Sequence, residues 1–170
     1  EFQRLVELER KALKYKTFHI DHEAYEETKR PEPLAEAVAV DVDAEAYDKW
    51  FKSNVIAQKQ EGYFAVNVRL LTGDFTTTQA RALAKIVERL ASDEIRFTIG
   101  QGFVIKFVPE ANLKVLYSEL DGLGFAEPGA DSTHDVTACP GTDTCNLGIA
   151  NSTGVAGVLE QVLRDDYPDY

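Results

Sequence analysis

The sequence predicts an α+β fold, in which strands and helices follow one another in the order β-α-β-β-α along the middle of the chain. The first observation is that apolar and polar side chains alternate over 63–71 and over 94–100, which is typical of half-buried strands. The second is an apolar stripe at helical spacing between these two segments. The third is Gly-Gln-Gly at 100–102, which indicates a tight turn between neighbouring strands.

The N-terminal part is expected to be a helical linker. Residues 2 to about 16 place apolar side chains at helical spacing among Glu, Arg and Lys, which predicts a helix. Residues 21–48 hold ten acidic and two basic side chains, with Pro31 and Pro33 preventing a continuous helix. This stretch is therefore expected to be a solvated connector with a short helix around 44–52.

The strand over 63–71 leads into a well-marked helix. Thr76 and Gln79 form a capping-box pattern, in which two side chains bond the free backbone N–H groups of a helix start. The apolar stripe that follows predicts a helix through about residue 91.

A hairpin and a second helix complete the regular part. The segment FVIKFVP at 103–109 is the expected return strand of the hairpin that begins with 94–100. Pro109 is expected to open a helix. The first N–H groups of a helix have no partner within the helix, so the N–H group that proline lacks is not needed there. Gly122 and Gly124 are expected to end this helix.

A further strand near 133–138 would complete the order β-α-β-β-α-β, which is the split pattern of ferredoxin-like domains. Such a sheet carries helices on one face only. The opposite face is either simply solvated, as is common in antiparallel sheets, or binds an anionic ligand. The side chains expected on it are Asn67, Arg69, Arg96, Thr98 and Lys106.

The composition argues against some classes of function. The 170 residues hold 18 basic and 29 acidic side chains, a net charge of −11, whereas a nonspecific nucleic-acid binder needs Lys and Arg to neutralise phosphates. No apolar run approaches the ~20 residues that cross a bilayer, and the N-terminus has no apolar signal-peptide core, so we expect a cytoplasmic protein. The chain contains no Met, which predicts that it is an interior fragment of a longer protein.

Two cysteines, Cys139 and Cys145, lie in a segment rich in Thr, Asp, Asn and Gly. They could be small buried residues, or half of a zinc site, although C-x5-C is an unusual zinc spacing. A catalytic cysteine would need a basic neighbourhood, but 115–163 contains neither Arg nor Lys. The Pro-Gly turn after Cys139 and the small polar residues leave backbone N–H groups available to sulfur, as a loop that binds a metal–sulfide cluster requires.

Three stretches together carry a resemblance to a known family. They read QKQEGYFAVNVRLLTGDFTTTQARALAKI (58–86), IRFTIGQGFVIKFVP (95–109) and ACPGTDTCNLGIANSTG (138–154). They resemble the siroheme-dependent nitrite and sulfite reductases, and the similarity runs from about Trp50 to the C-terminus. The resemblance implies a helical linker (1–60), a ferredoxin-like half domain (61–132) and the truncated start of a [4Fe-4S]- and siroheme-binding domain (133–170).

In that family four cysteines, arranged as C-x5-C and then C-x3-C, hold a [4Fe-4S] cluster that is bridged to siroheme. The resemblance implies that Cys139 and Cys145 are the first of these pairs and that this chain belongs to the second of two pseudo-repeats. The siroheme contacts that it implies are Arg96, Thr98 and Gln101, with Lys106 and Arg69 in addition.

The resemblance also implies the activity, which is the six-electron reduction of nitrite to ammonia or of sulfite to sulfide. Ferredoxin is the implied electron donor. It is expected to dock outside this chain, because ferredoxins are acidic and this chain, with a net charge of −11, is acidic as well. The C-x3-C pair and the first repeat are missing, so the chain is expected to be inactive on its own, without catalytic residues and without bound cofactors. Apolar surface left by the missing repeat would favour a homodimer.

Two other functions fit the same residues. One is a small electron-transfer module, in which two chains each contribute two cysteines to a shared cluster. The other is a non-catalytic ferredoxin-like binding domain, in which the cysteines are inert.

Overall fold

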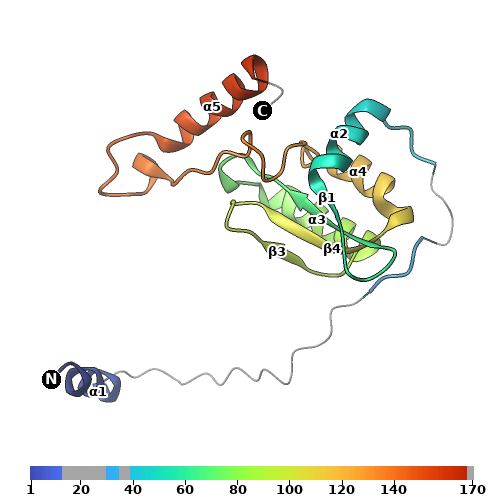
Figure 1. The fold of residues 1–170 in the computed structure, drawn as a ribbon. Helices are drawn as coiled ribbons and strands as arrows, with labels where there is room; N and C mark the ends of the chain where they lie inside the picture. Colours follow the sequence, from blue (N-terminus) through green and yellow to red (C-terminus); the bar gives the residue numbers. More distant parts are fainter. Residues whose placement is uncertain (13–29, 35–38, 168–170) are drawn as a thin grey trace.

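The computed structural model describes residues 1–12, 30–34 and 39–167. Its central element is an antiparallel sheet of four strands in the order β1-β2-β4-β3 (Figure 1). The strands are β1 (Val55–Ala57), β2 (Tyr63–Val68), β3 (Ile95–Phe97) and β4 (Phe103–Pro109). The helices around the sheet are α2 (Ala44–Asn54), α3 (Thr77–Leu90) and α4 (Leu113–Asp121). The predicted α+β, ferredoxin-like class is confirmed.

Most of the predicted elements are confirmed where the sequence pattern is regular. β4 has the predicted bounds of 103–109, and α2 covers the short helix expected around 44–52. Asp43 begins α2, because its side chain accepts a hydrogen bond from the backbone N–H of Ala46 at 2.9 Å. The strand expected over 63–71 is shorter than predicted and ends at Val68.

The start of α3 carries the predicted capping box. Thr76 Oγ1 accepts from the backbone N–H of Gln79 at 3.2 Å, and the backbone N–H of Thr76 donates to Gln79 Oε1 at 2.9 Å. Thr76→Ala is expected to lower the free energy of unfolding by about 1 kcal/mol, because one N–H group at the helix start loses its partner. Urea unfolding followed by Trp50 fluorescence measures this loss. Thr78→Ala, at an exposed position inside the helix, is the control, and an equal loss in both variants would contradict the role of Thr76.

The fourth strand is not where the sequence predicts it, and the expectation of a strand near 133–138 is wrong. β1 holds the edge position beside β2 and pairs with it antiparallel. β1 follows α2 directly, and the chain turns back to β2 through Gly62, whose φ of +79° suits glycine. Residues 128–134 form turns and bends, with φ of +90° at Gly129 and +59° at Asp131, and this backbone cannot extend a sheet.

The core lies between the helices and one face of the sheet. Trp50 of α2, Val66 of β2, Ile105 of β4 and Leu90 of α3 are all fully buried. The Trp50 ring lies 5.0 Å from the ring of Tyr117 in α4, measured between centroids. Burial of each such side chain contributes about 1.5–3 kcal/mol, so the sheet is a firm support for the segments attached to it.

The opposite face of the sheet is polar, as predicted. Val104 pairs with Asn67 on one side and with Arg96 on the other. Residues directly opposite one another across strands point to the same face, so these side chains form one row on the face away from the buried Ile105. Lys106 follows Val104 by two positions in β4 and shares that face.

The N-terminal and C-terminal parts each contain one helix. α1 (Phe2–Ala12) confirms the predicted helix as far as residue 12, and none of its residues is buried. The remainder of that prediction, and the parts of the connector at 21–29 and 35–38, lie outside the described residues. α5 (Ser152–Asp166) follows the cysteines. Within the described ranges, no helix has the length and apolar character needed to cross a membrane.

Candidate functional site

The two cysteines lie in a closed loop that leads into α5. A single 3-10 turn, η3 (Gly141–Asp143), follows Cys139. The backbone N–H of Cys145 donates to the carbonyl oxygen of Gly141 at 3.0 Å, so the second cysteine is tied to the beginning of the loop. Both thiols are free and exposed.

The loop closes because two glycines allow its backbone segments to touch. Gly141 has a φ of +54°, and a Cβ placed there would lie 2.5 Å from the carbonyl oxygen of Ala150. A Cβ on Gly148 would lie 2.8 Å from the backbone of Gly141. The backbone N–H of Thr142 donates to the Ala150 carbonyl at 3.1 Å. The glycines of this segment therefore set the shape of the loop that presents the thiols.

Cys139 is held against the start of α5. Its Sγ lies 3.5 Å from Oγ of Ser152, the first residue of the helix. The Ser152 hydroxyl, and after it the backbone N–H of Gly141, stabilise the thiolate and hold the pKa of Cys139 below its ordinary value. Sulfur binds metals as the thiolate, so this environment favours metal ligation.

The chemistry of these two side chains fits half of the ligand set of an iron–sulfur cluster. Two exposed thiols lie on a small polar loop, and N–H and O–H donors stabilise one of the sulfurs. A [4Fe-4S] cluster takes four cysteines. Among the described residues, no three His, Cys, Asp or Glu side chains come together to hold a metal ion. Cys139 and Cys145 can therefore supply two of the four ligands.

The cationic side chains of the polar sheet face share one acidic partner. Arg96 Nη2 lies 3.2 Å from Glu94 Oε1, and Lys106 forms an ion pair with the same oxygen. The side chain of Arg96 is 52% exposed and that of Lys106 is 21% exposed. Thr98 is exposed beyond the end of β3. The siroheme contacts expected for Arg96, Thr98 and Lys106 stay predictions.

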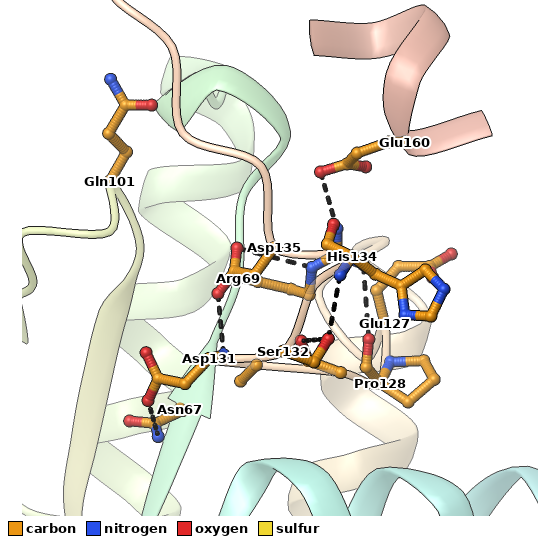
Figure 2. Close-up of polar contacts among 12 residues, drawn as sticks. Asn67, Arg69, Gln101, Glu127, Pro128, Asp131, Ser132, His134, Asp135 and Glu160 are labelled. Atoms are coloured by element: carbon orange, nitrogen blue, oxygen red, sulfur yellow. Dashed lines mark hydrogen bonds and ion pairs between the residues drawn. The ribbon is translucent and has the colours of Figure 1, made fainter. Parts of the chain in front are cut away.

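Arg69 lies in a different environment, beyond the end of β2 and beneath residues 128–167, which we call the C-terminal segment (Figure 2). Its Nη2 forms an ion pair with Glu160 Oε1 at 2.6 Å, and each of the two side chains is only 6% exposed. Nη2 also donates to the carbonyl oxygen of His134 at 2.5 Å, and Nη1 donates to that of Pro128 at 3.3 Å. Nε lies 3.7 Å from Asp135 Oδ1. The guanidinium thus joins the end of β2 to α5 and to the turns before the cysteines.

Gln101 is also bonded to the C-terminal segment. Its Nε2 donates to the carbonyl oxygen of Ala138 at 2.7 Å, and its Oε1 accepts from the backbone N–H of Ala138 at 3.1 Å. Ala138 directly precedes Cys139. The siroheme contacts expected for Arg69 and Gln101 stay predictions, while the structure directs both side chains to the segment that carries the thiols.

Sequence reasoning did not single out Glu160 or Asp135. The apolar residues of α5 would point to a buried stripe that includes Val155 and Val158, but both are 64% exposed. Ala156 and Glu160, one turn apart, are the buried pair in α5. Glu160 is the one charged residue within 152–163, and this is the signal that could have found the face, because a buried carboxylate requires a cationic partner.

Comparison with known proteins gives one family and several relatives. Residues 56–123 match the family described as the nitrite/sulfite reductase ferredoxin-like half domain. A sulfite reductase [ferredoxin] of Mycobacterium tuberculosis is 33% identical over 97 residues, which are 57% of this chain and 18% of the relative. A ferredoxin–nitrite reductase of Synechococcus elongatus is 28% identical over 132 residues, which are 78% of this chain and 25% of the relative.

A solved structure shows the same similarity in three dimensions. The structure of the Mycobacterium tuberculosis NirA protein superimposes with a TM-score of 0.57 and 31% sequence identity. The match covers 78% of this chain and 23% of the NirA chain. The chain thus spans between 18% and 25% of the length of these relatives.

Proposed function

We propose that this chain works as part of a siroheme- and [4Fe-4S]-dependent reductase, because residues 56–123 match the nitrite/sulfite reductase ferredoxin-like half domain. The observation that carries the proposal is the C-x5-C loop, whose two exposed thiols are attached to that half domain through Gln101. The proposed reaction is the six-electron reduction of nitrite to ammonia or of sulfite to sulfide. Ferredoxin is the proposed electron donor and docks outside this acidic chain.

Each group of side chains has a proposed role. Cys139 and Cys145 bind the [4Fe-4S] cluster, which supplies electrons when it is present. Arg96 and Lys106 of the polar sheet face would hold the carboxylates of siroheme through positive charge and charge-assisted hydrogen bonds. Thr98 adds a hydroxyl beside them. Arg69 and Gln101 are also proposed to contact siroheme, and their donors hold the C-terminal segment.

The remaining proposals concern the organisation of the chain. Residues 1–60 act as a linker, 61–132 as the half domain and 133–170 as the beginning of the cluster-binding domain. The chain alone is inactive and works in the cytoplasm as part of a longer polypeptide. An apolar stripe on α5 supports the proposal that isolated chains pair as a homodimer; it consists of Val155, Val158, Leu159 and Val162.

Cluster assembly tests the proposed function. Anaerobic reconstitution of the chain with iron and sulfide is expected to leave no column-stable [4Fe-4S] cluster on the monomer, because two thiolates leave two irons without protein ligands. In the longer reductase, Cys139→Ser and Cys145→Ser are each expected to abolish the cluster absorbance, whereas Thr144→Ser retains it. A stable cluster on the monomer would contradict the proposal. A cluster shared by two chains would favour an electron-transfer module, and a longer protein without any cluster would favour a binding domain.

A further inference from the structure

Gln101 occupies a backbone position that does not suit its side chain. It lies at the tip of the β3–β4 hairpin with a φ of +65°. Its backbone N–H donates to the carbonyl oxygen of Thr98 at 3.2 Å, which closes the turn. A side chain in this left-handed region costs roughly 1–2 kcal/mol, and glycine would avoid most of that cost. The strain at Gln101 indicates that its carboxamide makes contacts that a glycine could not make.

The carboxamide of Gln101 uses both of its ends on one residue. The amide nitrogen donates to the Ala138 carbonyl at 2.7 Å, and the amide oxygen accepts from the Ala138 N–H at 3.1 Å. This two-bond clamp, Gln101 on Ala138, fixes the position and the direction of the backbone at once, as a pair of bonds between strands does. The two residues are 37 positions apart in the chain, so the clamp joins the hairpin to a separate segment.

The hairpin tip is itself supported from behind. A Cβ on Gly73, whose φ is +80°, would lie 3.1 Å from Cβ of Gln101, so the 3-10 turn η1 (Leu71–Gly73) packs closely against the Gln101 side chain. The close approach restricts the rotamers that Gln101 can adopt. The clamp therefore extends from a supported position rather than from a loose loop.

Cys139 lies between the clamp and α5. Ala138 anchors the backbone on its N-terminal side to the sheet, and Ser152 lies 3.5 Å from its sulfur on the helix side. We propose that Gln101 is a positioning residue for Cys139, whose clamp on Ala138 fixes the sulfur relative to the sheet for binding to iron. This inference rests on the proposed function, because it assigns the iron of the proposed cluster to the sulfur that Gln101 positions.

Two substitutions separate the clamp from the backbone strain. Gln101→Asn keeps a carboxamide that tolerates positive φ, but the side chain is one methylene shorter and does not reach Ala138. Gln101→Glu keeps the acceptor for the Ala138 N–H. It replaces the donor to the Ala138 carbonyl by a carboxylate oxygen, which cannot donate. Gly100→Ala is the matched control at the same tip, because its Cβ would lie 3.8 Å from the nearest atom, Thr98 Oγ1.

Hydrogen exchange of the Ala138 amide in this chain measures the clamp without any cluster. We expect the exchange to be at least tenfold faster in Gln101→Asn, faster by a smaller factor in Gln101→Glu, and near the unaltered rate in Gly100→Ala. The melting midpoint of Gln101→Asn is expected to stay within a few degrees of the unaltered chain, because the core is not touched. Unchanged exchange of Ala138 in Gln101→Asn would overturn the proposal.

Cluster content of the longer reductase measures the consequence for iron. We expect less cluster per polypeptide in Gln101→Asn, partial recovery in Gln101→Glu and full content in Gly100→Ala. Full content in Gln101→Asn, with fast exchange at Ala138, would overturn the role of Gln101 and leave the proposed function intact. No cluster in the unaltered reductase would overturn the proposed function and the assignment to iron with it, although the exchange of Ala138 would still respond to Gln101.

Discussion

Replacing Arg69 by Met is expected to release α5 from the half domain, with a loss of about 3–5 kcal/mol in the stability of the docked arrangement. If α5 stayed docked in this variant, Glu160 would be a buried charge without its closest partner, because the ion pair at 2.6 Å would be lost. The carbonyls of His134 and Pro128 would lose their donors as well. α5 buries little else apart from Ala156, so few contacts oppose its release.

Hydrogen exchange along α5 measures this release. Amides of α5 are expected to lose protection in Arg69→Met, while the unfolding midpoint reported by Trp50 in the core changes much less. Arg69→Met combined with Glu160→Leu is expected to recover part of the loss, because no buried charge is left alone. The control is Arg164→Met, since Arg164 is 57% exposed and lies 4.0 Å from Glu160. Equal protection of α5 in Arg69→Met and in the unaltered chain would contradict the role of this ion pair.

Gly102→Ala is expected to destabilise the half domain itself by about 3 kcal/mol. A Cβ at this position would lie 2.3 Å from the carbonyl oxygen of Val68 and 3.3 Å from its carbonyl carbon. Both atoms belong to backbone, and Val68 pairs with Phe103 in the neighbouring strand, so relief requires that β2 and β4 separate. A domain of about 70–100 residues is expected to lose roughly 12–24 °C in melting temperature for such a loss.

The same substitution elsewhere in the chain provides the control for Gly102→Ala. A Cβ on Gly157, inside α5, meets nothing within 4 Å. Gly157→Ala is therefore expected to stabilise α5 by about 0.5–1 kcal/mol, because Ala has the higher helix propensity. Thermal unfolding of both variants under one set of conditions measures the difference. A loss below about 1 kcal/mol for Gly102→Ala would show that the two strands accommodate a methyl group.

Local patterns predicted the parts of the fold that local interactions determine. The bounds of β4, the capping box of Thr76 and the helix around 44–52 follow from alternation, capping and spacing within a few residues. β1 has only three residues, Val55–Ala57, which is too short for an alternation to be recognised. The prediction of a strand near 133–138 was wrong. Turns at Gly129 and Asp131 precede this segment, and the backbone of Ala138 bonds to the Gln101 side chain instead of to a neighbouring strand.

The candidate site was predicted less completely than the fold. The C-x5-C spacing drew attention to Cys139 and Cys145, and the structure has both thiols exposed on one loop. The alternation over 63–71 assigned Arg69 to the open sheet face, but the strand ends at Val68 and the guanidinium is buried. Its partner Glu160 lies 91 residues later, and no local pattern reveals a contact over that distance.

The long sequence separation between Arg69 and Glu160 has a consequence for the order of events as the chain folds. The core of the half domain is complete within residues that precede 128, whereas the ion pair and the Gln101 clamp need partners that come later in the chain. Closing such long loops is entropically costly until the two sides are already ordered. The half domain is therefore expected to form first and then serve as the template on which the thiols take their positions. In the proposed reductase, iron would meet a prepared pair of sulfurs only after folding, so that loading of the metal would report on the integrity of a distant core.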